Sequence, residues 1–439
     1  MTANLTLEGN RNYAAQVVTM PAPRKHPNAD RLEIFDVLGM QLIASTGTYK
    51  EGEIAVVFGA ETQLSEILAS EANLLRRSEM NKNPEVKGYL EDNRRVRAMK
   101  LRGQVSSALT IPEDEFCLIF GLTQGENLKP GTRFDHVNGV EVCRKYEIVT
   151  PQPRFLPEDA KRKKAFKRVD EAIFPQHLDT DNFFRASDGF TPADLEREVI
   201  VTQKLHGSSV RLANIPVKRK LTWLERIVQK LGVKVQAKEY DTIAGSRRVV
   251  KDANNPDAGF YKSDIWSDAL EAYDWALTEG YIIYGELVGY IPNGGPIQRG
   301  YTYEEPEGEY QLYVYRVAAV VGDDVVDLSW DQVKQFCAER DLNWTPELWR
   351  GKLKDFDWSQ FEDKDYFHEY VSAEVGSFFM NVADEPVRLS GSKTVDEGVV
   401  IRLDRGAKVP YLTKAKSPQF LLHETQLLDE GVTDMESVS

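Results

Sequence analysis

The chain has 439 residues, a formal net charge of −14 and a hydrophobic content of 41%. This length exceeds one ordinary hydrophobic core, so two or three domains are expected. The net acidity argues against broad affinity for nucleic acid but leaves room for a local basic groove. Residues 1–10 lack a signal-peptide pattern, no apolar run reaches the ~18 residues of a membrane span, and the three cysteines are scattered. The sequence therefore predicts a soluble cytoplasmic protein without a membrane partner, most simply a monomer.

The region from about residue 12 to residue 150 has the pattern of an all-β domain. Short strand candidates are separated by turn signals, which is typical of a small barrel. They are residues 13–20, 31–39, 41–47, 53–58, 95–101 and 107–111. A polar insertion at residues 64–93 is expected to be helical. Residues 134–148 are expected to lead out of this domain.

A segment rich in proline and charge follows, and strands and helices then alternate irregularly. The basic run that contains Lys163 and Lys164 is either a solvated face or a track for a phosphate backbone. Helices are expected at residues 222–230, at residues 263–278, and after a capping box formed by Ser329 and Gln332. The sequence thus predicts the divisions 1–150, 151–190 (an entry segment), 191–426 and 427–439 (a flexible acidic tail).

The most informative stretch is Val201-Thr202-Gln203-Lys204-Leu205-His206-Gly207-Ser208-Ser209. An apolar run leads into Lys204, a glycine-serine turn follows, and a second apolar run covers residues 210–215. This pattern predicts a hairpin with Lys204 at its lip. Lys-x-x-Gly alone is a weak motif, since a surface lysine at a turn also explains it.

Two carboxylates and two tyrosines lie in later strand candidates. Glu286 lies within an apolar strand, where a carboxylate is costly unless it has a partner or the strand is an edge facing water. Tyr313 and Tyr315 share one strand face because side chains alternate, and a pair of core aromatics is the plainer interpretation. Glu397 stands at the mouth of another apolar strand.

Three cations complete the set. Lys414 and Lys416 lie two residues apart and so share a strand face. Neighbouring ammonium groups repel, so this arrangement favours a polyanion beside them, unless the lysines only protect a sheet edge. Arg247 either clamps a phosphate or ribose or is a turn arginine.

In this order and spacing the segments resemble the covalent nucleotidyltransferase superfamily of ATP-dependent ligases and capping enzymes. The match covers roughly residues 195–420 and comprises Lys204-x-x-Gly207, Ser246-Arg247, Glu286, Tyr315, Glu397-Gly398 and Lys414-x-Lys416. Within the superfamily the chain is most similar to RNA ligases of the nicked-duplex kind. Their nucleophile motif is similar to Lys-Leu-His-Gly, and too little chain follows Lys416 to build the OB domain that DNA ligases and capping enzymes carry there.

This resemblance implies an α+β fold with an N-terminal OB-like β-barrel, followed by an adenylyltransferase domain of antiparallel sheets with flanking helices. Residues 24–32 and 100–103 resemble the OB-fold modules of tRNA-binding proteins, which predicts RNA contacts by Arg24, Lys25 and Arg102, or else an ordinary basic loop. The sequence departs from the family at Gln203, where glutamate is frequent, and at Ser209, where some members have asparagine. Tyr315-Arg316 replaces the more usual Phe-Asp.

The resemblance also implies a three-step reaction. The Lys204 amine attacks the α-phosphate of ATP, the AMP moves to a 5′-phosphate RNA end, and a 3′-hydroxyl displaces the AMP. The implied roles are a neutralising one for Lys414 and Lys416, binding of Mg²⁺ or Mn²⁺ by Glu397, and nucleotide binding by Gln203, Arg247, Glu286, Tyr315 and the two lysines. His206 either contacts phosphate and supports the later steps or is a turn histidine.

Two rival interpretations remain at this point. A DNA ligase or a GTP-using capping guanylyltransferase would share the nucleophile, although the domain order argues against both. A non-catalytic RNA-binding protein would rely on the OB-like domain alone. RNA repair is the expected setting, with a nick, a broken tRNA or a single strand as the substrate.

Overall fold

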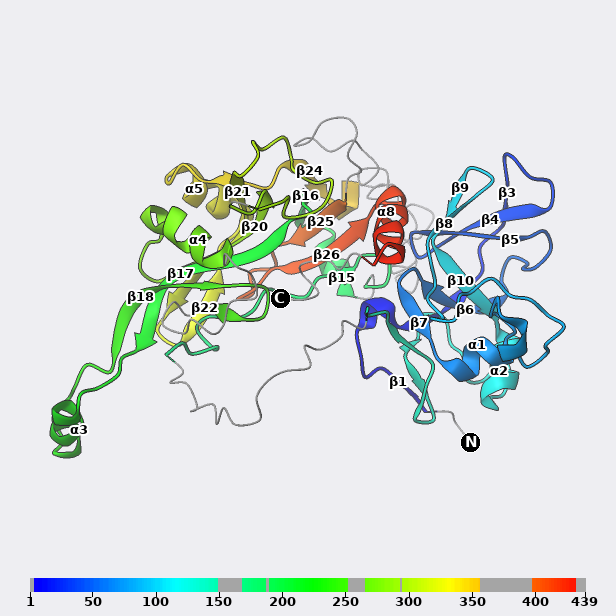
Figure 1. Ribbon diagram of the computed structural model, residues 1–439, viewed down its shortest axis with the longest axis horizontal. Coiled ribbons are helices and arrows are strands. Elements are labelled where there is room, and N and C mark those ends of the chain that lie inside the picture. Colours follow the sequence, from blue (N-terminus) through cyan, green and yellow to red (C-terminus); the bar gives the residue numbers. More distant parts are fainter. Residues whose placement is uncertain are drawn as a thin grey trace.

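The computed structural model describes residues 4–148, 168–186, 189–251, 265–292, 294–355 and 397–431. These residues form an N-terminal β domain and a larger domain of two sheets, with one helix between them (Figure 1). Lys163, Lys164 and the chain from residue 432 onward lie outside the described residues. Within the described part, no helix is long and apolar enough to cross a membrane.

The N-terminal domain consists of short strands, as predicted. Its main sheet has the order β10-β6-β2-β11, and its other strands form the groups β3-β4-β5, β1-β12-β13, β14-β7 and β8-β9. The strands are β1 (Leu5–Thr6), β2 (Ala15–Thr19), β3 (Arg24–Lys25), β4 (Leu32–Val37), β5 (Met40–Ser45), β6 (Ile54–Gly59), β7 (Thr62–Leu64), β8 (Met99–Leu101), β9 (Gln104–Ser106), β10 (Ala108–Pro112), β11 (Arg133–Phe134), β12 (His136–Val137), β13 (Val140–Glu141) and β14 (Cys143–Lys145). The helices are α1 (Glu66–Glu71) and α2 (Glu113–Phe120), with 3-10 turns at Arg11–Tyr13 and Ser78–Met80.

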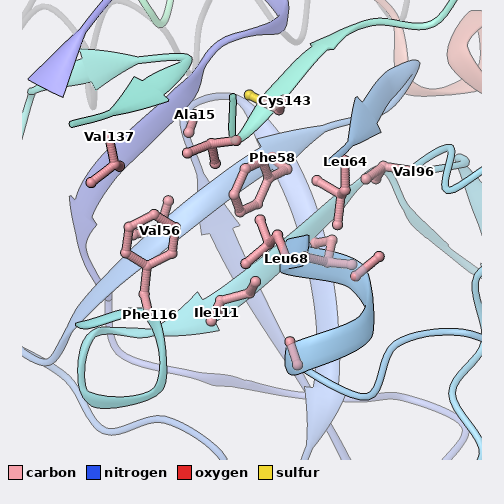
Figure 2. Close-up of a cluster of buried hydrophobic side chains, with 14 of the residues drawn as sticks. Ala15, Val56, Phe58, Leu64, Leu68, Val96, Ile111, Phe116, Val137 and Cys143 are labelled. Atoms are coloured by element: carbon pink, nitrogen blue, oxygen red, sulfur yellow. The ribbon is translucent and has the colours of Figure 1, made fainter. Parts of the chain in front are cut away.

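The main sheet of this domain is buried on both faces because its strands carry apolar residues at successive positions. On β6, Val56 and Phe58 face one core cluster, shown in Figure 2, while Ala55 and Val57 face another. This separation follows from the two-residue period of a strand. The core therefore fixes the register of the barrel on both sides.

Two expectations for this domain were wrong. Residues 64–93 contain only α1 and one 3-10 turn, because the side chain of Asn81 bonds to the backbone of Leu75 and Val86 and so competes with helical bonding. Residues 134–148 do not lead out of the domain. Their strands return to it, since β11 pairs with β2 and β14 pairs with β7.

The larger domain is built from two sheets. One has the order β15-β26-β25-β16-β24, and the other the order β19-β18-β17-β20-β21-β22, with β23 paired to β21. The strands are β15 (Asp181–Asn182), β16 (Glu198–Lys204), β17 (Ser208–Lys218), β18 (Lys238–Gly245), β19 (Val250–Lys251), β20 (Tyr281–Gly289), β21 (Tyr310–Val321), β22 (Asp324–Asp327), β23 (Asn343–Trp344), β24 (Glu347–Lys352), β25 (Gly398–Leu403) and β26 (Tyr411–Lys416). The helices are α3 (Trp223–Lys230), α4 (Ile265–Ala272), α5 (Trp330–Ala338) and α8 (Pro418–Asp429), with 3-10 turns at Pro192–Asp194, Asp274–Ala276 and Leu353–Asp355. Helices α4 and α5 pack against one face of the seven-stranded sheet.

The predicted hairpin around Lys204 was wrong. Strand β16 pairs with β24 and β25, whereas β17 pairs with β18 and β20 in the other sheet. The chain therefore crosses from one sheet to the other through Leu205, His206 and Gly207. Lys204 ends its strand at the junction of the two sheets.

The predicted helices are present with altered ends. Helix α3 begins at a capping box of Thr222 and Glu225, and α5 begins at the predicted box of Ser329 and Gln332. Helix α4 is shorter than expected. Helix α8 continues to Asp429, so the tail does not begin at residue 427, because Asp429 pairs with Arg95 of the N-terminal domain.

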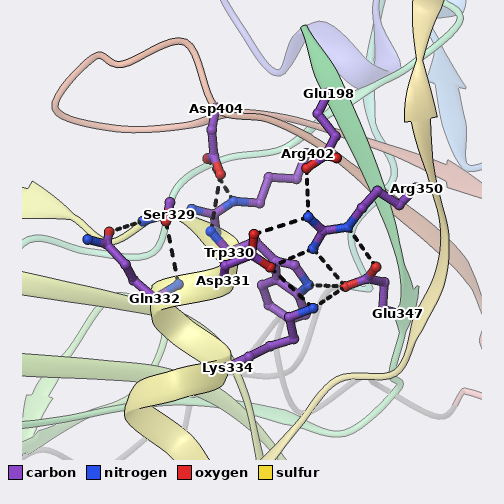
Figure 3. A network of polar contacts seen from close by, with 10 residues as sticks. All are labelled: Glu198, Ser329, Trp330, Asp331, Gln332, Lys334, Glu347, Arg350, Arg402 and Asp404. Atoms are coloured by element: carbon purple, nitrogen blue, oxygen red, sulfur yellow. Dashed lines mark hydrogen bonds and ion pairs between the residues drawn. The ribbon is translucent and has the colours of Figure 1, made fainter.

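A polar network ties the two sheets together (Figure 3). Arg350 on β24 bonds to Glu347 at 2.9 Å, to Asp331 on α5 at 2.7 Å and to Glu198 on β16 at 2.6 Å. Trp330 on α5 donates to Glu347 at 2.8 Å. Because α5 packs on the seven-stranded sheet and β24 belongs to the other, this network fixes one sheet against the other.

Candidate active site

Lys204 and Glu397 form the centre of the junction between the sheets. Lys204 lies opposite Gly398 in the pairing of β16 with β25, and its Nζ is 2.7 Å from Glu397 Oε1. His206 Nδ1 is 3.5 Å from the other carboxylate oxygen. Glu397 is 4% exposed. Burial alone would raise its pKa, but Lys204 and His206 hold the pKa below the usual range, so the carboxylate stays charged.

Glu286 holds the turn that follows Lys204. It lies on β20, between β17 and β21, so the alternative of an edge strand is wrong. One carboxylate oxygen accepts the Gly207 N–H at 3.0 Å, and the other is 3.4 Å from Ser209 Oγ. A Cβ at position 207 would lie 2.2 Å from the Leu287 carbonyl oxygen. Glycine is therefore required there for the backbone to approach β20 this closely.

Two residues that the sequence analysis missed also hold this turn. The His206 N–H donates to the Tyr303 hydroxyl at 2.7 Å, and Gln298 Nε2 donates to the Gly207 carbonyl at 2.8 Å. Both come from the irregular loop between β20 and β21. No local motif marks them, because only the folded chain brings that loop against Gly207.

The two lysines of β26 lie beside this centre, as the alternation predicted. Lys414 pairs with Val400 and Lys416 with Gly398 on β25. Burial, followed by the charges of Lys416 and Lys204, lowers the pKa of Lys414 to about 8. Burial would also lower the pKa of Lys416, but its ion pair with Glu424 at 2.7 Å raises it instead.

The expectation that Tyr313 and Tyr315 share a strand face is wrong. The pairing of β20 with β21 shifts register at Tyr315, and the two tyrosines pack in different clusters. The Tyr315 hydroxyl is 2.6 Å from His177 Nδ1, and this cluster includes Tyr284. Tyr313 packs beside Tyr301, Tyr303 and Phe420, near His206. The sequence analysis also missed His177, which comes from the segment before β16.

Arg316, the residue after Tyr315 on β21, is buried. Its Nε donates to Asp327 on β22 at 2.8 Å, and its guanidinium lies 4.1 Å from the centre of the Tyr284 ring. With Arg211 and Arg247, it also lowers the pKa of the buried His177, although burial is the larger cause. His177 is therefore neutral at physiological pH.

Gln203 and Arg247 differ in where their side chains lie. Gln203 is buried next to Lys204 on β16, so its side chain points to the opposite face of that strand. Arg247 is 3.2 Å from Asp179, and its charge contributes to the lowered pKa of Lys414. The charge of Arg247 therefore acts on Lys414, whereas the side chain of Gln203 does not face Lys204.

The basic residues of the N-terminal domain come together at one exposed edge. Asn28 Nδ2 donates to the Arg102 carbonyl at 2.9 Å, which brings the loop after β3 against the β8–β9 turn. Arg24, Lys25 and Arg102 are exposed there, and Arg24 pairs with Asp36. Their contact with RNA stays a prediction.

The site offers one carboxylate to a cation. Among the described residues there is no group of three or more histidine, cysteine or acidic side chains that could hold a metal. Within the same part of the chain, the buried Oε2 of Glu397 has no hydrogen-bond partner. A hydrated hard cation fits this position, since Mg²⁺ and Mn²⁺ keep several waters and take further oxygens from phosphates.

Comparisons with known proteins agree with this geometry. A profile of the RNA ligase family matches residues 197–416, and a profile of an OB-fold domain matches residues 15–113. No curated protein matches the chain.

Solved structures of Naegleria gruberi RNA ligase have the same fold. A mutant with ATP and Mn is 15% identical, covers 93% of this chain and 98% of its own, and superposes with a TM-score of 0.56. A mutant with AMP and Mn is 15% identical, covers 93% and 97%, and has a TM-score of 0.55. A mutant in the apo state is 14% identical, covers 95% and 100%, and also has a TM-score of 0.55. The predicted OB domain followed by a nucleotidyltransferase domain is thus confirmed, and the chain belongs to the RNA ligase family.

Proposed function

We propose that this RNA ligase joins a 5′-phosphate to a 3′-hydroxyl RNA end with ATP, through AMP bound covalently to Lys204. The observation that carries the proposal is the gathering of Lys204, Glu397, Lys414 and Lys416 at one junction between two sheets. ATP, AMP and Mn accompany the Naegleria gruberi ligase in its structures, and we extend them to this chain.

In the first step the Lys204 amine attacks the α-phosphate and pyrophosphate leaves. A lysine is nucleophilic only when it is deprotonated, and its ordinary pKa is about 10.4. The contact with Glu397 favours the charged form, so Lys204 must lose both its proton and this contact before it reacts. A divalent cation at Glu397 would supply positive charge that competes with the ammonium for the carboxylate and neutralises phosphate.

Lys414 and Lys416 would stabilise the phosphate during transfer, where charge neutralisation matters more than covalent help. Glu286 would hold a ribose hydroxyl while keeping its bond to Gly207. Tyr315 would stack on the base, and Arg247 would contact phosphate or ribose. Gln203 would contribute through its main chain, because its side chain faces away from Lys204.

His206 would help in the later transfers of AMP, since it faces the same carboxylate as the nucleophile. A nick in an RNA duplex is the substrate we favour, with Arg24, Lys25, Arg102, Lys163 and Lys164 as candidate contacts to its backbone. We place the OB domain within residues 1–150 and the nucleotidyltransferase domain at residues 191–426, followed by the remainder of α8, and expect a monomer.

The test is covalent labelling with α-³²P-ATP and Mg²⁺ or Mn²⁺. Wild-type protein should retain label after denaturation, and Lys204→Ala should retain none. Lys408→Ala is the matched control, because this exposed lysine pairs with Asp324 away from the junction. A labelled Lys204→Ala protein would refute the nucleophile assignment. Sealing assays with RNA or DNA on each side of a nick would then identify the substrate.

A further inference from the structure

The two lysines of β26 differ in one contact. Lys416 pairs with Glu424 on α8 at 2.7 Å and lies 5.1 Å from the centre of the Phe420 ring. Among the described residues, Lys414 makes no ion pair. A lysine side chain has four flexible carbons, so an acidic partner that fixes its end also fixes where its charge lies.

The position of Glu424 depends on how α8 is placed. The helix begins at Pro418, directly after its N-cap Ser417, whose side chain accepts the Phe420 N–H. Residues four apart lie above one another on a helix, so Phe420 and Glu424 share the face toward Lys416. A rotation or tilt of α8 would therefore move the Glu424 carboxylate relative to Lys416.

The N-terminal domain forms hydrogen bonds and an ion pair with the neighbouring face of the same helix. The Thr425 hydroxyl donates to Glu61 at 2.7 Å and accepts the Ala98 N–H at 3.1 Å. Glu61 bonds in turn to Arg95 at 3.0 Å, and Arg95 pairs with Asp429 one turn further along α8. Glu61, Arg95 and Thr425 are buried, so water does not replace these bonds readily.

We propose that Glu424 is a positioning residue for Lys416, and that the N-terminal domain sets its position by holding α8 through Thr425 and Asp429. This proposal rests on the proposed role of Lys416 at the phosphate. It assigns the OB domain a part in forming the adenylate as well as any part in binding RNA. The gain is preorganisation, since the Lys416 charge is placed before ATP arrives.

The loss of Glu424 has a defined electrostatic result. Lys416 would remain buried beside Lys414. Tyr13 and Glu397 would still raise its pKa, but loss of Glu424, the first of the raising charges, would lower the pKa toward the value of about 8 that Lys414 has. The rate of Lys204 adenylation in Glu424→Gln, relative to wild type, should therefore decrease as the pH rises from 7 to 9. At pH 9 we expect the rate of adenylation in the variant to be about tenfold lower than in wild type. This is the loss expected when the pKa of Lys416 lies roughly one unit below the assay pH.

Two readouts test this role separately from the proposed function. The first is the pH profile of adenylation, with Glu430→Gln as control, because Glu430 is the C-cap residue of the same helix but pairs with the exposed Arg299. The second is competitive acetylation of Lys416 read by mass spectrometry, which reports its pKa without any catalysis. Glu424→Gln should make Lys416 reactive at a lower pH, and Glu430→Gln should not. An unchanged Lys416 reactivity would overturn the proposal even if Lys204 is adenylated. A wild type that forms no adduct would overturn the proposed function alone.

A double-mutant cycle tests whether the contacts of the OB domain with Thr425 act through Glu424. Thr425→Val keeps the size of the side chain but removes the hydroxyl, so it should reproduce part of the Glu424→Gln effect. If these contacts act through Glu424, adenylation by the double variant should be only slightly slower than by Glu424→Gln. Multiplicative losses would show that the two residues act independently and would overturn the second half of the proposal.

Discussion

The contact between Lys204 and Glu397 gives the proposed nucleophile a stable resting form. The carboxylate is buried and held charged by the cations around it, so the amine beside it also keeps its proton. Phosphate and a divalent cation entering the junction would change both partners at once. Under the proposed mechanism, the resting ion pair would couple the reactivity of Lys204 to the arrival of its substrate.

The proposed contact of Lys414 with the phosphates of ATP would make ATP binding depend on pH. Burial and the charges of Lys416 and Lys204 lower its pKa to about 8, and nearby phosphates would raise that value again. Binding of ATP above pH 8 therefore takes up a proton, and the affinity falls as the pH rises. We expect the Kd to weaken by up to about tenfold per pH unit between pH 8.5 and 10, the limit for one linked proton.

Isothermal titration of ATP across this pH range measures the slope. Lys414→Met should bind ATP more weakly at pH 7 but with a flatter pH dependence. Lys408→Met, which alters an exposed lysine, should keep the wild-type slope. Equal slopes in wild type and Lys414→Met would contradict the assignment of the titrating group.

At the scale of elements, the pair β17 and β18 extends away from the sheet and carries α3 at its tip (Figure 1). The apolar residues of α3 and its C-cap Leu231 lie on one side of the helix and are exposed, with Trp223 at 68% and Leu231 at 75%. Exposed apolar surface of this kind promotes association. The arm follows the end of β17 that is remote from Ser208, so we expect it to have no direct effect on the chemistry at Lys204.

Replacing this apolar face should therefore separate solubility from activity. Trp223→Ser combined with Leu231→Ser should reduce light scattering and binding of a hydrophobic dye, with a change in stability of no more than about 0.5 kcal/mol. Labelling of Lys204 should be unchanged. Leu212→Ala, in the buried part of β17, should instead lower the free energy of unfolding by about 2–5 kcal/mol. Loss of label in the double variant would show that the arm contributes to the site.

The elements also show what the sequence could and could not predict. Alternating apolar residues predicted most strands, and capping residues predicted α5, because both signals are local. The predicted pairing of β16 with β17 was wrong. An apolar run followed by a glycine-serine turn has the same sequence pattern whether the two strands pair with each other or belong to different sheets. Gln298 and Tyr303 could not be predicted, because their contacts with the turn after Lys204 depend on distant parts of the chain.

At the scale of the whole molecule, the network around Arg350 sets the relation between the two sheets. Its bonds to Glu347, Asp331 and Glu198 reach α5, β24 and β16. Hydrogen bonds with Arg350, which outweigh burial, lower the pKa of Glu347 to about 2. A carboxylate with a depressed pKa stabilises the fold above its unfolded pKa of about 4.3, and that stabilisation is lost as the pH falls through about 2.

Arg350→Met should therefore lower the free energy of unfolding at pH 7 by about 2–3 kcal/mol, because several bonds to charged groups are lost. Urea denaturation followed by tryptophan fluorescence measures the change, which should shrink toward pH 2. The control is Lys352→Met, whose lysine pairs with Glu196 at 3.7 Å in an exposed position, and its effect should stay within about 0.5 kcal/mol. Equal losses in both variants would mean that the network is not the tie between the sheets.

The bond between Glu61 and Thr425 joins residues that are 364 positions apart. During synthesis from the N-terminus, the OB domain can therefore be complete long before its partner helix emerges from the ribosome. Until then Glu61 lacks the bond to the Thr425 hydroxyl, and Arg95 lacks the ion pair with the Asp429 carboxylate. The bonds that place Glu424 beside Lys416 can therefore form only after α8 has been synthesised.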